Sequence, residues 1–169
     1  FPFRYNNFEE LLALVNAHDI GVIKMEVVRN AEPENNFLQK VRELATRRGI
    51  VLIFDECTSG FRETFGGLHL KYGVEPDLAM FGKALGNGYA ITAIIGRREV
   101  MEAAQSTFIS STFWTERIGP TAALKTLEVM EREKSWEKIT TTGTDIRQRW
   151  QKLANKHDLS IEHWGLSAL

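Results

Sequence analysis

The chain has 169 residues, a length sufficient for one domain with its own core. Hydrophobic residues make up 43% and charged residues 25%, and the formal net charge is −1, so no basic surface for nucleic acid or an anionic membrane is indicated. The single cysteine, Cys57, excludes an intrachain disulfide and fits a reducing compartment, and no apolar run is long enough to span a bilayer. We therefore expect a cytoplasmic protein whose partners include neither nucleic acid nor membrane.

The spacing of apolar residues predicts helices and strands in alternation. In chain order, the pattern predicts a helix at 7–17, a strand at 20–28, a helix at 37–48, strands at 50–54, 78–81 and 92–95, a short helix from 96 to 101, and long helices at 116–131 and 135–157. Such an alternation is typical of an α/β fold with a sheet that is parallel in part.

Three of these strands, 50–54, 78–81 and 92–95, are short apolar runs, which are typical of strands buried on both faces by helices. Near the C-terminus, residues 160–164 resemble the beginning of a further strand. The chain begins at Phe1 with neither an initiator methionine nor a signal-peptide pattern, so we expect a piece of a longer protein.

Two charged residues stand where buried strands end. Asp55 closes the strand at 50–54, and Lys83 follows the strand at 78–81 after one glycine. Open α/β sheets bind ligands beyond the carboxyl ends of their strands, so both side chains are expected to face one crevice. An amine and a carboxylate placed in this way suit pyridoxal phosphate, because lysine can form a Schiff base and a carboxylate can keep the pyridine nitrogen protonated. The same two residues would also be explained by a structural ion pair or by solvated strand ends.

A longer pattern surrounds these two residues. It consists of Phe-Asp-Glu-Cys-Thr-Ser-Gly-Phe-Arg at 54–62, Tyr-Gly-Val-Glu-Pro-Asp-Leu at 72–78 and Gly-Lys-Ala-Leu-Gly-Asn-Gly at 82–88. Together these motifs resemble the signature of the class III aminotransferases, and most closely their glutamate-1-semialdehyde 2,1-aminomutase branch. The resemblance implies the large domain of a fold type I pyridoxal-phosphate enzyme, which acts as a homodimer on an amino acid or another small amino or keto compound.

The resemblance also implies roles for single residues. Lys83 would form the Schiff base and act in catalysis, and Asp55 would pair with the pyridine nitrogen. Cys57 occupies a position where the family usually has a β-branched residue packed on the cofactor ring, and Asn30 would reach the ring oxygen. Thr112 falls where the family binds the cofactor phosphate of the neighbouring subunit, although Ser110, Ser111 and Thr115 lie close by in the sequence.

By the same resemblance, residues 1–157 form an incomplete cofactor-binding large-domain segment, and 158–169 begin a C-terminal small domain. The leading functional hypothesis is amino-group transfer through Lys83. One alternative is an aminomutase that moves an amino group within one substrate. Another is an inactive fragment or degenerate homologue that only dimerises, and the segment alone is expected to be inactive because no phosphate-binding glycine- and serine-rich loop precedes Asp55.

Other polar residues have simpler interpretations. Cys57 is better explained as a small packing residue than as a nucleophile, because neighbouring carboxylates disfavour the thiolate. Arg62 could grip a substrate carboxylate, but a salt bridge that holds its loop is the simpler interpretation. The four histidines lack the spacing of metal ligands, so no metal site is expected.

Overall fold

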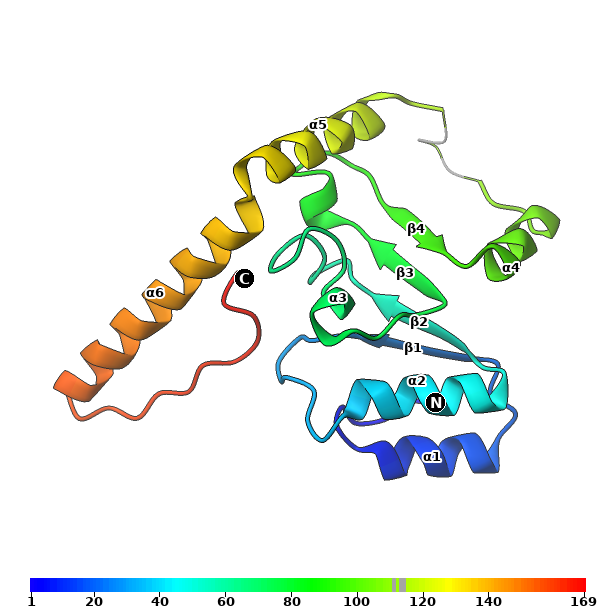
Figure 1. Cartoon of the computed structure of the whole chain (residues 1–169), viewed down its shortest axis with the longest axis horizontal. Coiled ribbons are helices and arrows are strands. Elements are labelled where there is room, and N and C mark those ends of the chain that lie inside the picture. Colours follow the sequence, from blue (N-terminus) through cyan, green and yellow to red (C-terminus); the bar gives the residue numbers. More distant parts are fainter. Residues whose placement is uncertain (111, 113–114) are drawn as a thin grey trace.

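The computed structural model describes residues 1–110, 112 and 115–169, and within them the core is a four-stranded sheet of order β1-β2-β3-β4 (Figure 1). The strands are β1 (Val22–Glu26), β2 (Val51–Asp55), β3 (Leu78–Phe81) and β4 (Ala93–Gly96). The helices are α1 (Phe8–Ala17), α2 (Phe37–Arg48), α3 (His69–Tyr72), α4 (Arg98–Met101), α5 (Ile118–Glu133) and α6 (Ser135–Lys156), with 3₁₀ turns at Lys83–Leu85 and Glu102–Ser106. The first three strands are parallel and β4 is antiparallel to β3, which confirms the α/β fold and the partly parallel sheet.

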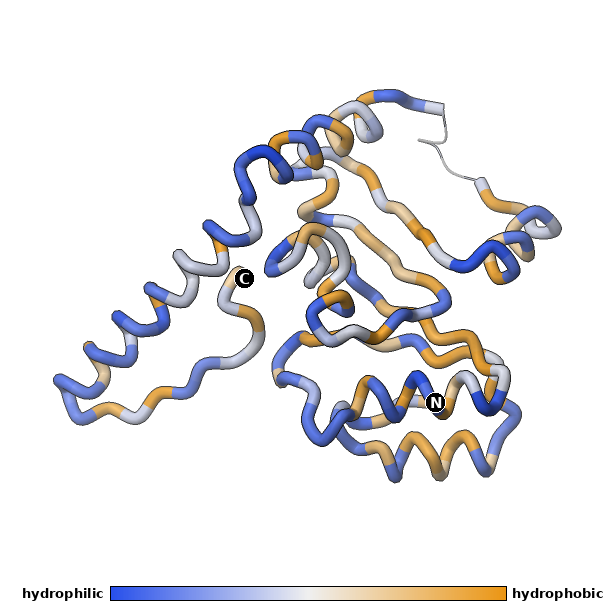
Figure 2. Tube along the Cα trace, in the orientation of Figure 1, coloured by the Kyte–Doolittle hydropathy of each residue, from blue (hydrophilic) through white to orange (hydrophobic). Residues whose placement is uncertain are grey.

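Helices α1 and α2 cover one face of the sheet (Figure 1). The Asn7 side chain accepts a hydrogen bond of 3.1 Å from the Glu10 N–H and so fixes the start of α1. Gly49 ends α2 in the left-handed conformation, with φ of 64°, as its place after the amphipathic helix predicts. The apolar sides of both helices pack against alternate residues of the strands, and the resulting band of hydrophobic residues is visible in Figure 2.

The strand register separates a covered face of the sheet from a second face, here called the open face. On β2, Leu52 and Phe54 point to the covered face and are fully buried. Val51, Ile53 and Asp55 point the other way and are only half-buried. The expectation that this strand is buried on both faces is therefore wrong for the part of the chain that the structure describes, because helices pack on one face alone.

β4 was expected to be a third buried strand, and this is also wrong. Ile94 and Ile95 are 51% and 58% exposed, because β4 is the last strand of the described sheet and pairs with β3 alone among the described strands. An apolar run therefore predicted the strand correctly but not its burial.

Asp77 lies directly before β3, at the end of the parallel strands that is opposite to Asp55. Its buried carboxylate accepts hydrogen bonds from the Leu52 N–H at 2.8 Å, from Arg42 at 2.9 Å and from Arg97 at 3.0 Å. Although partial burial raises the pKa of Asp77, these donors together hold it below its ordinary value. The aspartate of the motif at 72–78 thus ties β2, β3 and the segment after β4 together.

Helix α6 extends away from the sheet, and the segment that follows it returns toward the sheet (Figure 1). Residues 160–164 were expected to begin a strand, but the structure has an irregular segment there. This segment is held by Arg147, whose guanidinium donates to the carbonyl groups of residues 164, 165 and 166, and Leu166 is buried in the main core.

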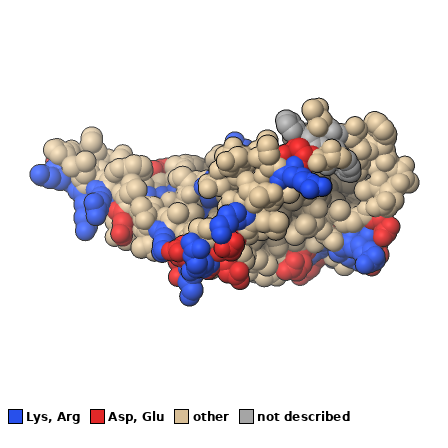
Figure 3. All heavy atoms as spheres, turned by 90° about the horizontal axis from the view of Figure 1, so that it is seen from above, with Lys and Arg blue, Asp and Glu red and all other residues tan. Residues whose placement is uncertain are grey.

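Within the described residues, no helix combines the length and the apolar character needed to cross a membrane. Basic and acidic side chains lie interspersed on the surface drawn in Figure 3, in keeping with the formal net charge of −1.

Candidate active site

Asp55 and Lys83 lie at one edge of the sheet. Asp55 is the last residue of β2, and Lys83 follows β3 after Gly82. Because β2 and β3 are parallel neighbours, with Asp55 in register with Met80, their carboxyl ends meet at the same edge. The structure therefore brings together the two residues that the sequence singled out.

Cys57 lies between these two residues. Its N–H donates to Asp55 Oδ1 at 3.1 Å, and a Cβ atom built on Gly82 would lie 3.5 Å from its sulfur. Partial burial and a hydrogen bond to Asp55 raise the pKa of the Cys57 thiol, while the positive charges of Lys83 and Lys24 oppose that rise. The thiol is therefore a small packing group that bridges the ends of β2 and β3.

Lys83 has an unusual backbone conformation. Its φ of 40° lies in the left-handed region, which a residue with a side chain adopts at a cost of about 1–3 kcal/mol. The exposed side chain donates a hydrogen bond from Nζ to the hydroxyl of Thr58, in the loop that follows β2. Strain of this kind is concentrated at functional sites, and the amine itself remains accessible.

Asp55 forms an ion pair that the sequence analysis missed. Lys24 on β1 places Nζ 2.9 Å from Asp55 Oδ2, and the two side chains are 52% and 25% exposed. Partial burial raises the pKa of Asp55, but the hydrogen bonds from Lys24 and Cys57 outweigh it, so the carboxyl is held below its usual pKa. Asp55 is consequently an anion near neutral pH, as a partner for a pyridine nitrogen must be.

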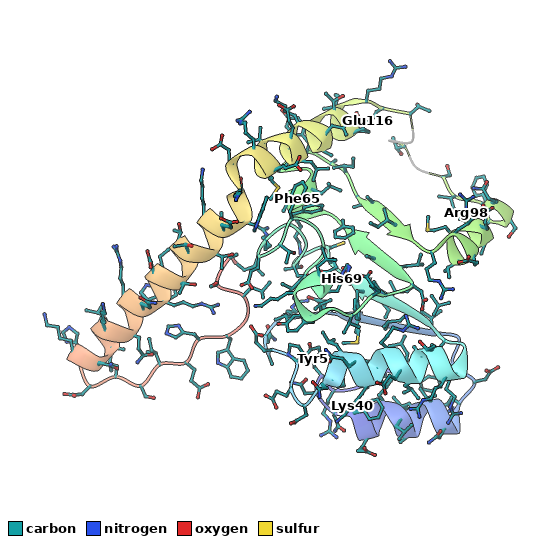
Figure 4. The ribbon with its side chains drawn as sticks, viewed as in Figure 1. Tyr5, Lys40, Phe65, His69, Arg98 and Glu116 are labelled. Carbon is teal, nitrogen blue, oxygen red and sulfur yellow. The ribbon has the colours of Figure 1, made fainter. Side chains whose placement is uncertain are left out.

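The loop between β2 and α3 is held by Glu56, whose side chain is fully buried. Glu56 Oε1 accepts from the backbone N–H of His69 at 3.0 Å and lies 2.8 Å from His69 Nδ1, and Oε2 accepts from the Ser59 hydroxyl. Figure 4 labels His69 on α3, beside the end of β2. The position of the loop, and of Thr58 within it, therefore depends on a buried carboxylate next to Asp55.

A cavity of about 1100 Å³ lies on one side of Lys83, between the turn that follows β3 and α5. Among the described residues, the lining has no carboxylate and four cationic side chains, which are Arg62, Lys83, Arg117 and Lys125. Nε of Arg62 is buried without a hydrogen-bond partner, and no ion pair of Arg62 is found among the described residues, so the salt-bridge interpretation is not supported. The cavity suits an anionic ligand, but Asp55 does not line it.

Of the two other predicted cofactor ligands, Asn30 is not brought to this edge, and Thr112 is expected to serve the neighbouring subunit and not this site. Asn30 is exposed, and the hydrogen bond described for it runs from the Gly165 N–H to its backbone carbonyl. Thr112 is exposed in a turn, and its alternative Ser111 lies outside the described residues. In the described part of the chain, no contact joins Asn30 or Thr112 to Asp55 or Lys83.

The side chains at the sheet edge fit part of pyridoxal phosphate. A primary amine is present for the aldehyde carbon and an anionic carboxylate for the ring nitrogen, on adjacent strand ends. Donors for the phosphate are less evident. At the start of α5, the N–H groups of Ile118 and Gly119 already donate to the carboxylate of Glu116, which Figure 4 labels.

Comparison with known proteins relates this arrangement to one family. Residues 21–163 match the model of the class-III aminotransferases. The 3-aminobutyryl-CoA aminotransferase of Cloacimonas acidaminovorans is 36% identical over 98% of this chain and 42% of its own length. The glutamate-1-semialdehyde 2,1-aminomutase of Natranaerobius thermophilus is 34% identical over 93% of this chain and 39% of its own length. The chain thus spans about two-fifths of the length of these curated relatives.

Solved structures agree with the fold. The PLP internal aldimine form of the FumI protein of Sphingopyxis sp. MTA144 superposes with a TM-score of 0.94 at 26% identity, over 99% of this chain and 42% of that one. An ornithine aminotransferase from Plasmodium yoelii gives a TM-score of 0.80 at 22% identity, over 90% of this chain and 42% of that one, and at that identity supports the fold alone.

Proposed function

Because the chain belongs to the class-III aminotransferase family, we propose that it is the large-domain segment of a pyridoxal-phosphate enzyme that transfers an amino group to or from an amino acid or a related amino or keto compound. The observation that carries the proposal is the placement of Asp55 and Lys83 on adjacent parallel strand ends. On this proposal, residues 158–169 begin the small domain.

When bound, pyridoxal phosphate supplies an electron sink for the carbon that carries the amino group. Lys83 would hold the cofactor covalently through Nζ and, once released by the incoming amine, would move a proton at the substrate carbon. Asp55 would keep a proton on the ring nitrogen through its negative charge. Cys57 would pack against the ring, Asn30 would reach its oxygen, and Thr112 would bind the phosphate of the neighbouring subunit.

An intramolecular aminomutase is the second candidate. The observation that favours it is the near-equal identity to an aminotransferase, at 36%, and to an aminomutase, at 34%. Both reactions would use Asp55 and Lys83 in the same roles, so the present residues support the shared chemistry and not one outcome.

We also propose a cytoplasmic homodimer. Exposed apolar side chains on β4, before α5 and at the first residue of α5 offer a surface for a second subunit, and these are Ile94, Ile95, Phe108, Ile109 and Ile118. The free thiol of Cys57 fits a reducing compartment.

Borohydride reduction of the full-length protein with pyridoxal phosphate tests the proposal directly. After proteolysis, peptide mapping is expected to find the pyridoxyl group on Lys83, because its amine stands at the sheet edge beside Asp55. Lys83→Ala serves as the control and should lose the label. A label on Lys71 or Lys125 in place of Lys83 would contradict the proposed site.

A further inference from the structure

We infer that Lys24 is a tuning residue: it shares Asp55 with the pyridine nitrogen of the cofactor and thereby lowers both the proton affinity of that nitrogen and the affinity for the cofactor. The inference rests on the proposed function, and it concerns a residue outside the family motifs quoted above.

Strand geometry brings Lys24 to Asp55. Lys24 is in register with Ile53 on the neighbouring strand, and Asp55 lies two residues further along the same face. Side chains in such a diagonal relation lie within reach of a long lysine stem. The ammonium therefore approaches Asp55 from β1, along the open face, and meets Oδ2 at 2.9 Å.

Both carboxylate oxygens of Asp55 are already engaged by the chain itself. Oδ1 accepts from the Cys57 N–H at 3.1 Å, and Oδ2 is paired with Lys24. A carboxylate offers about four lone-pair sites, so it can accept a further donor without releasing these two. Asp55 can thus bind Lys24 and a pyridine nitrogen at the same time.

The charges around Asp55 determine how sharing its carboxylate between Lys24 and the pyridine nitrogen affects protonation of that nitrogen. Asp55 and Lys24 together are neutral, and the adjacent Glu26 is compensated by Arg29 at 2.8 Å. A protonated pyridine added to Asp55 therefore meets the Lys24 ammonium, and Glu26, the carboxylate in register with Asp55, is already paired with Arg29 and offsets the added charge only weakly. An ammonium on the same carboxylate competes for its charge and disfavours protonation of the ring nitrogen.

The test compares Lys24→Met, which keeps most of the side-chain length and removes the charge, with Lys24→Arg, which keeps the charge. Because Lys24 is half-exposed, removing its charge is expected to tighten cofactor binding by about two- to fivefold. With pyridoxal phosphate labelled with ¹⁵N in the ring, the nitrogen resonance of the Lys24→Met holoenzyme should stay at its protonated position to higher pH. Lys24→Arg should behave like the unaltered protein.

Two controls separate this effect from others. Lys40→Met makes the same change on α2, where Figure 4 labels Lys40, and should alter neither quantity. In an Asp55→Asn background, Lys24→Met should have no further effect, because Lys24 acts through Asp55.

The outcomes are distinct. Unchanged affinity and an unchanged ¹⁵N titration in Lys24→Met, or weaker binding, would overturn the role of Lys24 while leaving the proposed function intact. Failure of the unaltered full-length protein to bind pyridoxal phosphate at all would overturn the proposed function and this inference with it.

Discussion

Gly60 is a residue at which the loop after β2 passes close to the side chain of Phe81 on β3. A Cβ atom placed there would lie 2.7 Å from the Glu56 carbonyl oxygen and 2.7 Å from the ring of Phe81. Neither the backbone carbonyl nor a ring packed in the core can move freely, so the loop has no room for a methyl group at this position.

We predict that Gly60→Ala lowers the free energy of unfolding by about 1–3 kcal/mol, because the added methyl overpacks a filled space. Urea-induced unfolding measures the change. Gly21→Ala is the matched control, since nothing lies within 4 Å of the corresponding Cβ position. Equal stability of the two variants would show that the loop can shift to make room for the methyl group, contrary to what its contacts indicate.

Single residues also show how far the sequence could predict the site. Asp55 and Lys83 were singled out because a charged residue at the end of an apolar strand, or just beyond it, is visible within one segment of the sequence. Lys24 was missed because its pairing with Asp55 depends on the register of β1 against β2, and the sequence of one strand does not specify that register. The signal available was a lone lysine inside an apolar strand, two residues before Glu26 on the same face.

At the scale of elements, the segment from 56 to 69 is held by one buried carboxylate. Burial by itself raises the pKa of Glu56, but its hydrogen bonds with His69 and Ser59 outweigh this and hold the pKa below the ordinary value of 4.5. A carboxyl with a lowered pKa in the folded state stabilises the fold fully above its unfolded-state pKa and loses that contribution as the pH falls through the folded-state value.

We therefore predict that Glu56→Gln reduces the free energy of unfolding by about 1.5–3 kcal/mol at pH 7, the range for hydrogen bonds to a charged group. The difference from the unaltered protein should shrink as the pH falls below 4.5, where the Glu56 carboxylate takes up a proton. Denaturant unfolding at several pH values measures it, with the exposed Glu43→Gln on α2 as control. A difference independent of pH would rule out the charge of Glu56 as its cause.

Elements differ in how well their sequence predicts them. Helix α2 was predicted to the residue, at 37–48, because an apolar stripe and a terminal glycine are local signals. The burial of β2 and β4 was not, because burial depends on which elements pack over a strand. The strand predicted at 160–164 is not formed for the same reason: the conformation of this segment depends on contacts from elsewhere in the chain, namely from Arg147 on α6.

At the scale of the whole molecule, the candidate ligands of pyridoxal phosphate lie in separate parts of the chain. The amine and the carboxylate stand together, whereas Thr112 lies apart in an exposed turn and the N–H groups that begin α5 are occupied by Glu116. A phosphate needs several donors at once, typically backbone N–H groups at a helix start.

We predict that residues 1–169 alone bind pyridoxal phosphate weakly, without a saturable visible absorbance band, whereas the full-length protein binds it tightly as a dimer. Absorbance titration combined with light scattering measures both properties. Pyridoxal without its phosphate is the control and should bind the segment about as poorly. Tight one-to-one binding by a monomer of the segment would mean that the cationic cavity beside Lys83 holds the phosphate.

The exposed strand β4 has one more consequence, for how the segment behaves in concentrated solution. On the side away from β3, its backbone N–H and C=O groups face no further strand of the described sheet, and Ile94 and Ile95 lie exposed beside them. A short apolar strand with open hydrogen-bonding groups is a template for the same strand of another copy. Produced by itself, the segment should therefore tend to aggregate by lateral strand pairing as its concentration rises. A partner that covers the unpaired edge of β4 would keep the segment in solution.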